Sequence, residues 1–214
     1  MARTRRRCFV IASVLLAVLG SSSAARAAEA GTGPEVTILL YNDAHIPESD
    51  LALAEQQATR IFLQSGIRSR WLDCFALATQ QGVHCGEVWG PRVFLLRIVL
   101  NGRGFDDTVF GTAYLSGSTA GKYADVFYDR IERMHAIWHT SRAGLLGYVA
   151  AHEIGHLLLG SHSHAPIGIM RAHWQAEEIR QISMGSLFFS PQQARQMRTR
   201  LEAEDAVRLT ALGK

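Results

Sequence analysis

The segment AHEIGHLLLGSHSHAPIGIM, residues 151–170, gathers four histidines and one glutamate among small and apolar residues. Its start has the pattern H-E-x-x-H, formed by His152, Glu153 and His156. On a helix the two histidines lie one turn apart on the same face, so both imidazoles can reach one ion. Glu153 lies about 100° around the helix from His152, close enough to a metal-held water to act as a general base without being a ligand. This pattern predicts a catalytic zinc site, in which the metal lowers the pKa of water and the carboxylate takes its proton.

The residues around the motif favour this prediction over a chance match on a surface helix. The stretch AGLLGYVAAHEIGHLLLG, residues 143–160, is almost wholly apolar, and a helix that is apolar on every side is buried. An unpaired carboxylate in such a place is costly, and a metal site removes that cost. We therefore expect Glu153 and both histidines to belong to a metal centre.

The motif and the residues after it resemble the metzincin branch of zinc-dependent peptidases. In that family H-E-x-x-H-x-x-G-x-x-H supplies three ligands, and a later methionine forms a tight turn beneath the metal. The resemblance implies zinc as the cofactor and assigns four residues: ligands His152 and His156, general base Glu153, and Met170 in the methionine turn. His162 has the metzincin spacing, but Gly160 stands one residue later than the glycine of that pattern.

A second resemblance covers nearly the whole chain. It is to a family of uncharacterised exported bacterial proteins, of the type found in acidobacteria, that share the segment HEIGHLLLG. The shared blocks here are WLDC (71–74) with a second cysteine downstream, LLRI (95–98), YADVFYDR (123–130) and SHS followed by GIMRA. In those relatives the third histidine falls at the position of His164, and the position of His162 is commonly asparagine. We therefore expect His164 to be the third ligand, with His162 as the alternative.

Residues 1–27 have the pattern of a secretory signal peptide. MARTRRRC is basic, FVIASVLLAVLG is apolar but short for a membrane span, and Ala25-Arg26-Ala27 is a typical cleavage site. We expect a secreted or periplasmic protein without a stable membrane anchor after cleavage, and a single domain over residues 28–214.

The charge of the chain changes when this segment is removed. The segment holds five of the 22 basic residues and none of the 19 acidic ones, which leaves 17 against 19 and a formal net charge of −2. The charge therefore does not favour binding to nucleic acid, and we expect no nucleic-acid partner. Cys74 and Cys85 remain, and a cysteine pair in an exported chain predicts one disulfide.

The remaining pattern predicts an α+β domain with a small mixed β-sheet and packed helices. β-rich or alternating segments predict strands near 35–42, 67–73, 92–100, 110–115 and 123–129, with the most apolar one, 92–100, at the centre. A helix between Ser49 or Asp50 and Gly66 follows the first strand, and further helices are expected at 131–140, 143–160 and 174–182. Ser190, Pro191 and Gln193 are typical of a helix start. The metal-binding helix thus follows the last strand, and the methionine turn and C-terminal helices come after it.

These features predict an exported zinc-dependent metalloendopeptidase that cleaves a peptide or protein substrate by Glu-assisted attack of zinc-bound water. Glu153 favours an enzyme, because metal binding alone does not need this acid. The alternatives are a zinc-stabilised binding domain without catalysis and a periplasmic metal carrier, the latter favoured by the density of histidines at 162–164.

Overall fold

The computed structural model describes residues 33–74, 85–116 and 119–212. The predicted signal peptide, residues 1–27, lies outside them. Among the described residues, no helix has both the length and the apolar character that crossing a membrane requires.

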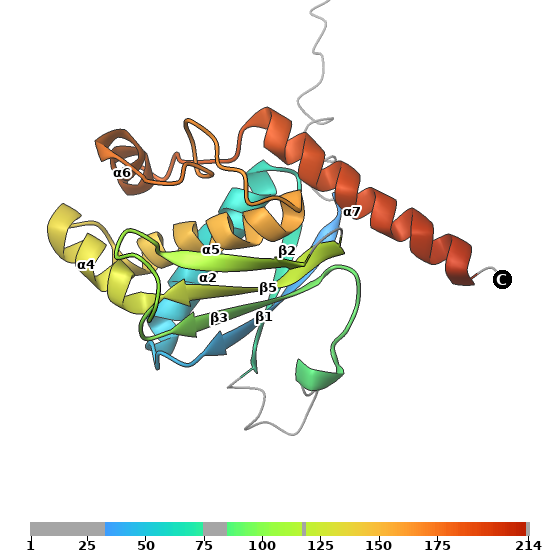
Figure 1. Ribbon diagram of the computed structural model, residues 1–214, viewed down its shortest axis with the longest axis horizontal. Coiled ribbons are helices and arrows are strands. Elements are labelled where there is room, and N and C mark those ends of the chain that lie inside the picture. The colour runs from blue at the N-terminus through green and yellow to red at the C-terminus, as the bar shows by residue number, and fades with distance from the viewer. Residues whose placement is uncertain (1–32, 75–84, 117–118, 213–214) are drawn as a thin grey trace, which may run out of the picture.

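Five strands form one mixed sheet in the order β2-β1-β3-β5-β4 (Figure 1). Four of the strands are parallel to one another: β1 (Glu35–Asn42), β2 (Arg68–Asp73), β3 (Val93–Val99) and β5 (Thr119–Phe127). β4 (Gly111–Ser116) runs antiparallel to β5 and forms one edge of the sheet. The α+β prediction with a mixed sheet is confirmed, and the strand expected at 92–100 is the central one.

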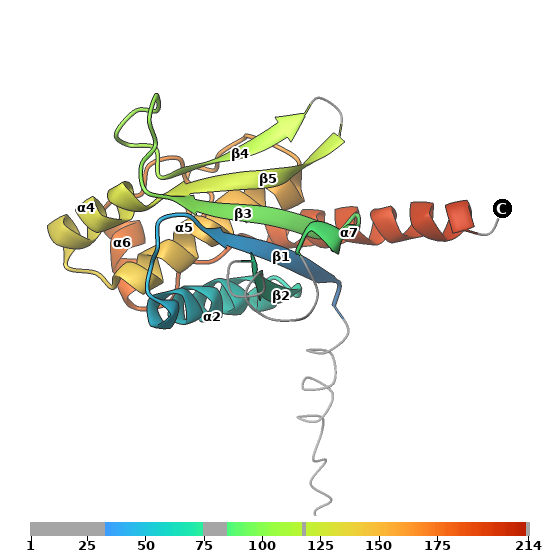
Figure 2. The ribbon, with the colours of Figure 1, turned by 90° about the horizontal axis from the view of Figure 1, so that it is seen from below.

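Two helices, α2 (Glu48–Gln64) and α5 (Arg142–Leu159), cover one face of the sheet (Figure 2). Every second residue of the central strands points to these helices, as the two-residue period of a strand requires. The buried residues on this face of the sheet include Ile38, Leu40, Phe94, Leu96, Ile98, Ala124 and Val126. They pack with apolar residues of both helices into the main core, and this core holds α5 in place.

The opposite face of the sheet carries a smaller core built around the predicted disulfide. Cys74 and Cys85 are bonded, with their Cα atoms 5.6 Å apart. Both cysteines are buried with Leu39, and the partly buried Tyr41, Leu72, Val88 and Val93 pack against this group. The disulfide joins the end of β2 to the 3-10 turn Cys85–Glu87.

The remaining helices flank these two layers. α4 (Tyr128–Trp138) follows β5 directly, three residues earlier than the helix expected at 131–140. α6 (Ala176–Ser183) and α7 (Pro191–Leu212) follow the motif segment, and α7 extends away from the sheet in Figure 1. The expected start of α7 is confirmed, because Gln193 N–H donates to Ser190 Oγ (3.2 Å) and Ser190 N–H donates to Gln193 Oε1 (2.8 Å).

The start expected for α2 is wrong. The residue before the first helical turn is Pro47, not Ser49 or Asp50, and no side chain caps that turn. Pro47 ends the preceding loop with a fixed φ near −55°. Ser49 and Asp50 therefore lie inside the first turn, where an acidic side chain still interacts favourably with the helix dipole.

Candidate metal centre

α5 carries the H-E-x-x-H motif in its last two turns. Ser141 caps the helix by accepting a hydrogen bond from Gly144 N–H at 3.2 Å. Gly160 ends it in the left-handed conformation, at φ 63°, which glycine adopts without a steric penalty. Nearly the whole helix is buried, as its apolar sequence predicts. The chain can turn back at Gly160 and bring the following histidines over the motif.

The first two histidines converge on one point. The Nε2 atoms of His152 and His156 lie 3.1 Å apart, although the two side chains are only 8% and 4% exposed. Two unprotonated ring nitrogens at this separation repel each other unless a proton or a cation lies between them. The arrangement therefore fits a cation held by both side chains.

Backbone carbonyls fix the other nitrogen of each ring. His152 Nδ1–H donates to Ile169 O, and His156 Nδ1–H donates to Ser161 O, both at 2.7 Å. A carbonyl oxygen only accepts, so the proton of each neutral ring is assigned to Nδ1 and the lone pair to Nε2. Metal-binding histidines in proteins have this same arrangement.

His164 completes a group of three ligand atoms. Nitrogen atoms of His152, His156 and His164 all lie within 4.8 Å of one another, which is close enough for one ion. The His164 ring centroid lies 4.9 Å from that of His156, with the planes nearly perpendicular, and 5.5 Å from that of His152. His162 lies farther away, with its ring centroid 6.2 Å from that of His156. The fold thus brings together the set that contains His164, and it leaves His162 at the rim of the same cavity.

The residues after the histidines form the turn expected around Met170. Arg171 N–H donates to Gly168 O at 3.0 Å, and Ala165 N–H donates to Met170 O at 2.8 Å. Met170 is fully buried, and its Sδ lies 2.9 Å from the place that a Cβ on Gly155 would occupy. Gly155 stands between Glu153 and His156 in the motif. Met170 therefore packs directly against the glycine side of the helical turn that carries the motif.

Trp174 supports the same turn from the other side. Its Nε1–H donates to Ile169 O at 3.1 Å, and Ile169 O also accepts the hydrogen bond from His152. The ring meets His152 edge to face, with the centroids 6.0 Å apart. A single carbonyl thus connects His152 to the wall of the cavity.

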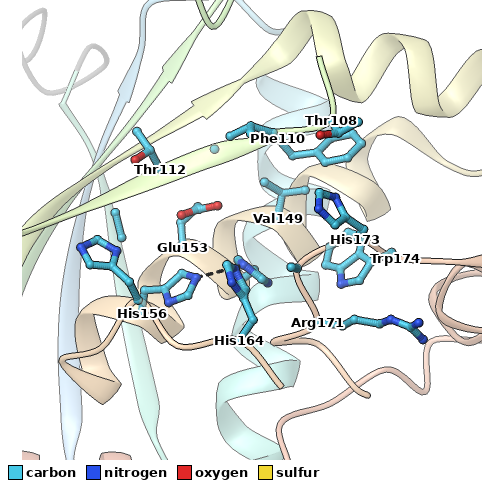
Figure 3. A pocket seen from close by; sticks show the side chains of 16 residues that line it. Thr108, Phe110, Thr112, Val149, Glu153, His156, His164, Arg171, His173 and Trp174 are labelled. Carbon is cyan, nitrogen blue, oxygen red and sulfur yellow. Dashed lines mark hydrogen bonds between the residues drawn. The ribbon is translucent and has the colours of Figure 1, made fainter. Parts of the chain in front are cut away.

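Glu153 is buried beside the histidines, at 5% exposure. Burial raises the pKa of its carboxyl group to about 8, because the ionised form is poorly solvated there. Figure 3 shows the carboxyl group directed toward the strand that carries Thr112. An acid with a pKa near neutrality is suited to both taking up and releasing a proton.

Burial has the opposite effect on the histidines, because their charged form is the protonated one. It lowers the pKa of His152 to about 3 and that of His156 to about 4, with the neighbouring imidazoles adding to the effect. The pKa of His164 is also lowered, mainly by burial. All three rings are therefore neutral near pH 7, which is the state that binds a metal ion. The three nitrogen donors and their bonded Nδ1 atoms fit zinc.

A cavity of about 400 Å³ opens over this group (Figure 3). One wall comes from α5 and the loop after it. A second wall comes from Thr108–Ala113, at the end of the loop after β3 and the beginning of β4, and a third from Arg171–Trp174. His173 is an exposed loop residue in this third wall.

The wall at 108–113 was not predicted from the sequence. These residues lie some forty positions before the motif, and only the order of strands brings them to it. The one local indication is the small-residue run at the start of β4, GTA at 111–113, because small residues in a strand mark a place where another element approaches closely.

Comparison with known proteins found similarities among solved structures. No protein-family model and no curated protein sequence matches the chain. The fold is similar to the crystal structure of archaemetzincin from Methanopyrus kandleri, at 16% sequence identity and a TM-score of 0.46. The match covers 80% of this chain and 97% of that one. A likeness at this level transfers no residue roles, so the roles given to side chains here rest on their own geometry.

Proposed function

We propose that this protein is a zinc-dependent metallopeptidase with its catalytic centre on α5. The observation that carries the proposal is the convergence of three imidazoles next to a buried acid in an open cavity. His152, His156 and His164 would hold zinc, and Glu153 would be the general base. Zinc, when bound, supplies a Lewis acid that lowers the pKa of water and polarises a carbonyl group.

Glu153 would move the protons of the reaction. Its carboxylate would take a proton from the attacking water and pass it to the amine that leaves when the peptide bond breaks. In the metal-free site burial raises the pKa of this acid to about 8, and a bound cation would lower it toward the ionised form that takes the first proton. Arg171, Trp174 and Phe110 would shape the space for the side chains of the substrate.

The substrate would be a peptide or protein in extended form. β4 is an edge strand, and an edge strand offers unpaired backbone N–H and C=O groups to an added strand. Gly111, Thr112 and Ala113 of this strand line the cavity. A peptide that pairs with β4 would therefore cross the cavity next to Glu153.

The test compares zinc-loaded wild-type protein with Glu153→Gln, using reduced casein as an unfolded substrate. We expect cleavage by the wild type and a loss of about 100- to 10,000-fold in kcat for the variant, the usual contribution of a general acid–base group. Zinc content measured by atomic absorption should stay at one ion per chain in both. Equal cleavage rates in the two proteins would contradict the mechanism.

We also propose that the protein is exported with cleavage after residue 27. The disulfide Cys74–Cys85 supports this, because such bonds persist in oxidising compartments. Mass spectrometry of the protein from a bacterial periplasm should give a chain that begins at Ala28. A chain that keeps residues 1–27 would contradict it.

A metal carrier is the second candidate, favoured by the number of imidazoles in one cavity. His162 and His173 line it in addition to the three clustered histidines. Exchange of bound zinc with a fluorescent chelator separates the two functions. A carrier releases the ion within seconds to minutes, whereas a catalytic site retains it for hours.

A further inference from the structure

Gly111, the first residue of β4, faces the carboxyl group of Glu153. A Cβ placed on Gly111 would lie 2.7 Å from Cγ and 2.8 Å from Oε1 of Glu153. Both distances are shorter than any ordinary contact between such atoms. A side chain at this position and the present place of the carboxyl group therefore exclude each other.

The close approach extends over this corner of the sheet. Ala113, two residues along the same strand face, is buried in the main core. On β5, a Cβ at Gly121 would lie 2.9 Å from a methyl group of Leu157, one residue after His156. Small residues on both strands thus let the metal-binding turns of α5 lie directly against the sheet. Glu153 is the polar side chain of these turns that reaches the β4 edge.

We propose that Gly111 is a positioning residue for Glu153. The missing side chain leaves room for the carboxyl group next to the histidine cluster, and the glycine backbone limits how far the acid can turn toward the strand. This inference rests on the proposed peptidase function and adds a residue that the motif does not contain.

A methyl group at Gly111 would displace the acid but leave the ligands in place. The Nδ1 atoms of His152 and His156 are held by carbonyls of residues 161 and 169, which belong to the segment after α5 and not to β4. Zinc binding should therefore persist. A displacement of the base by about 1 Å costs up to ~100-fold in rate.

The first experiment measures Gly111→Ala. We expect kcat for casein-derived peptides to fall about 10- to 100-fold, with KM within about threefold of wild type. Zinc stoichiometry and the visible spectrum of the cobalt-substituted protein, which reports ligand geometry, should not change. Gly147→Ala is the matched control. Its Cβ would lie 2.5 Å from Ala54 O between α2 and α5, away from Glu153, so it should lower the melting temperature and retain kcat.

A double variant, Gly111→Ala with Glu153→Asp, tests whether the loss of activity comes from displacement of Glu153 or from a clash with the backbone of β5. The same Cβ at Gly111 would also lie 2.6 Å from Asp125 O on β5. Shortening the acid with Glu153→Asp relieves the first contact and not the second. If Gly111 positions the acid, the double variant should lose less activity than the product of the two single losses, by a factor of about 3 or more. This factor corresponds to a coupling of about 0.7 kcal/mol.

Different results would contradict the role of Gly111 and the proposed peptidase function. Wild-type kcat in Gly111→Ala, or losses that simply multiply in the double variant, would overturn the role of Gly111. If Gly111→Ala does not fold, the double variant decides: folding restored by the shorter acid supports the proposal, and a double variant that also fails overturns it. A wild-type protein without any peptidase activity overturns the proposed function instead, and the cobalt spectra then still report the ligand set.

Discussion

In the motif segment, hydrogen bonds to backbone carbonyls orient the rings of two of the four histidines. His152 and His156 each donate from Nδ1 to a carbonyl at 2.7 Å, which orients Nε2 toward the other ring. These carbonyls belong to residues that follow α5, so both rings are oriented by the segment that also carries His164. A change in that segment should therefore affect metal binding even where it removes no ligand.

Replacing His164 and His162 separately tests which of them completes the site. We expect His164→Ala to weaken zinc binding by more than about 100-fold, because even residues that only orient a ligand contribute 10- to 100-fold. His162→Ala should change it by less than about threefold, since its ring lies outside the group of three. Competition with a chelator of known affinity measures both. Strong loss in His162→Ala alone would reassign the third ligand.

At the residue scale, the sequence predicted which side chains cluster better than it predicted the cavity walls around them. The pattern of His152, Glu153 and His156 is local, so its one-turn spacing is legible without a fold. The position of His164 depends on a turn at Gly160, and that of Gly111 depends on which strand forms the edge of the sheet. Neither is encoded in a short run of residues. The resemblance to the exported bacterial proteins, and not the metzincin spacing, pointed to His164.

Among the elements, the strands and the buried helix were predictable and several helix starts were not. β1 has the bounds that its sequence predicts, and α5 ends at the expected glycine. Both are decided by long apolar patterns that agree with their burial. The start of α4 was misplaced because Tyr128 and Asp129 continue β5 into the helix without a capping residue. Helix ends without a side-chain cap leave little trace in sequence.

The carboxyl group of Glu55 on α2 interacts electrostatically with that of Asp73 at the end of β2. Burial raises the pKa of its carboxyl group to about 7, and the charge of Asp73 adds to this. The group has a higher pKa in the folded state than its model value of 4.5, so folding favours the protonated form. Its contribution to stability is fully present below pH 4.5 and is lost as the pH rises to about 7.

Glu55→Gln should therefore remove this pH dependence of the free energy of unfolding. Relative to wild type, we expect the variant to gain stability between pH 4.5 and 8, by about 1 kcal/mol after allowance for the partial exposure of the carboxyl group. Urea unfolding at a series of pH values measures the difference. Gln56→Ala, a neutral change at an exposed site of α2, is the control and should show no such trend. A difference that is constant across pH would contradict the explanation.

Across the whole molecule, the two faces of the sheet carry separate structures. The main core and the histidine cluster lie on the side of α2 and α5, and the disulfide cluster of Leu39, Cys74 and Cys85 lies on the other. In β1, Ile38 and Leu40 belong to the main core, whereas Leu39 between them belongs to the second. The sheet thus separates the candidate metal centre from the bond that stabilises the chain. Stability and metal binding should respond independently to changes on the disulfide face.

The double variant Cys74→Ser/Cys85→Ser tests this separation. The bond closes a short loop, with a sequence separation of 11. Its removal should lower the free energy of unfolding by about 2–3 kcal/mol, because the unfolded chain regains conformational freedom. Zinc affinity should stay within about threefold of wild type, since α5 and the segment after it contact the other face. Urea unfolding and chelator competition measure the two quantities on the same samples, and wild-type protein reduced with a thiol-free phosphine should behave like the variant. A parallel loss of zinc affinity would mean that the sheet transmits strain from one face to the other, and that the histidine cluster depends on the disulfide for its geometry.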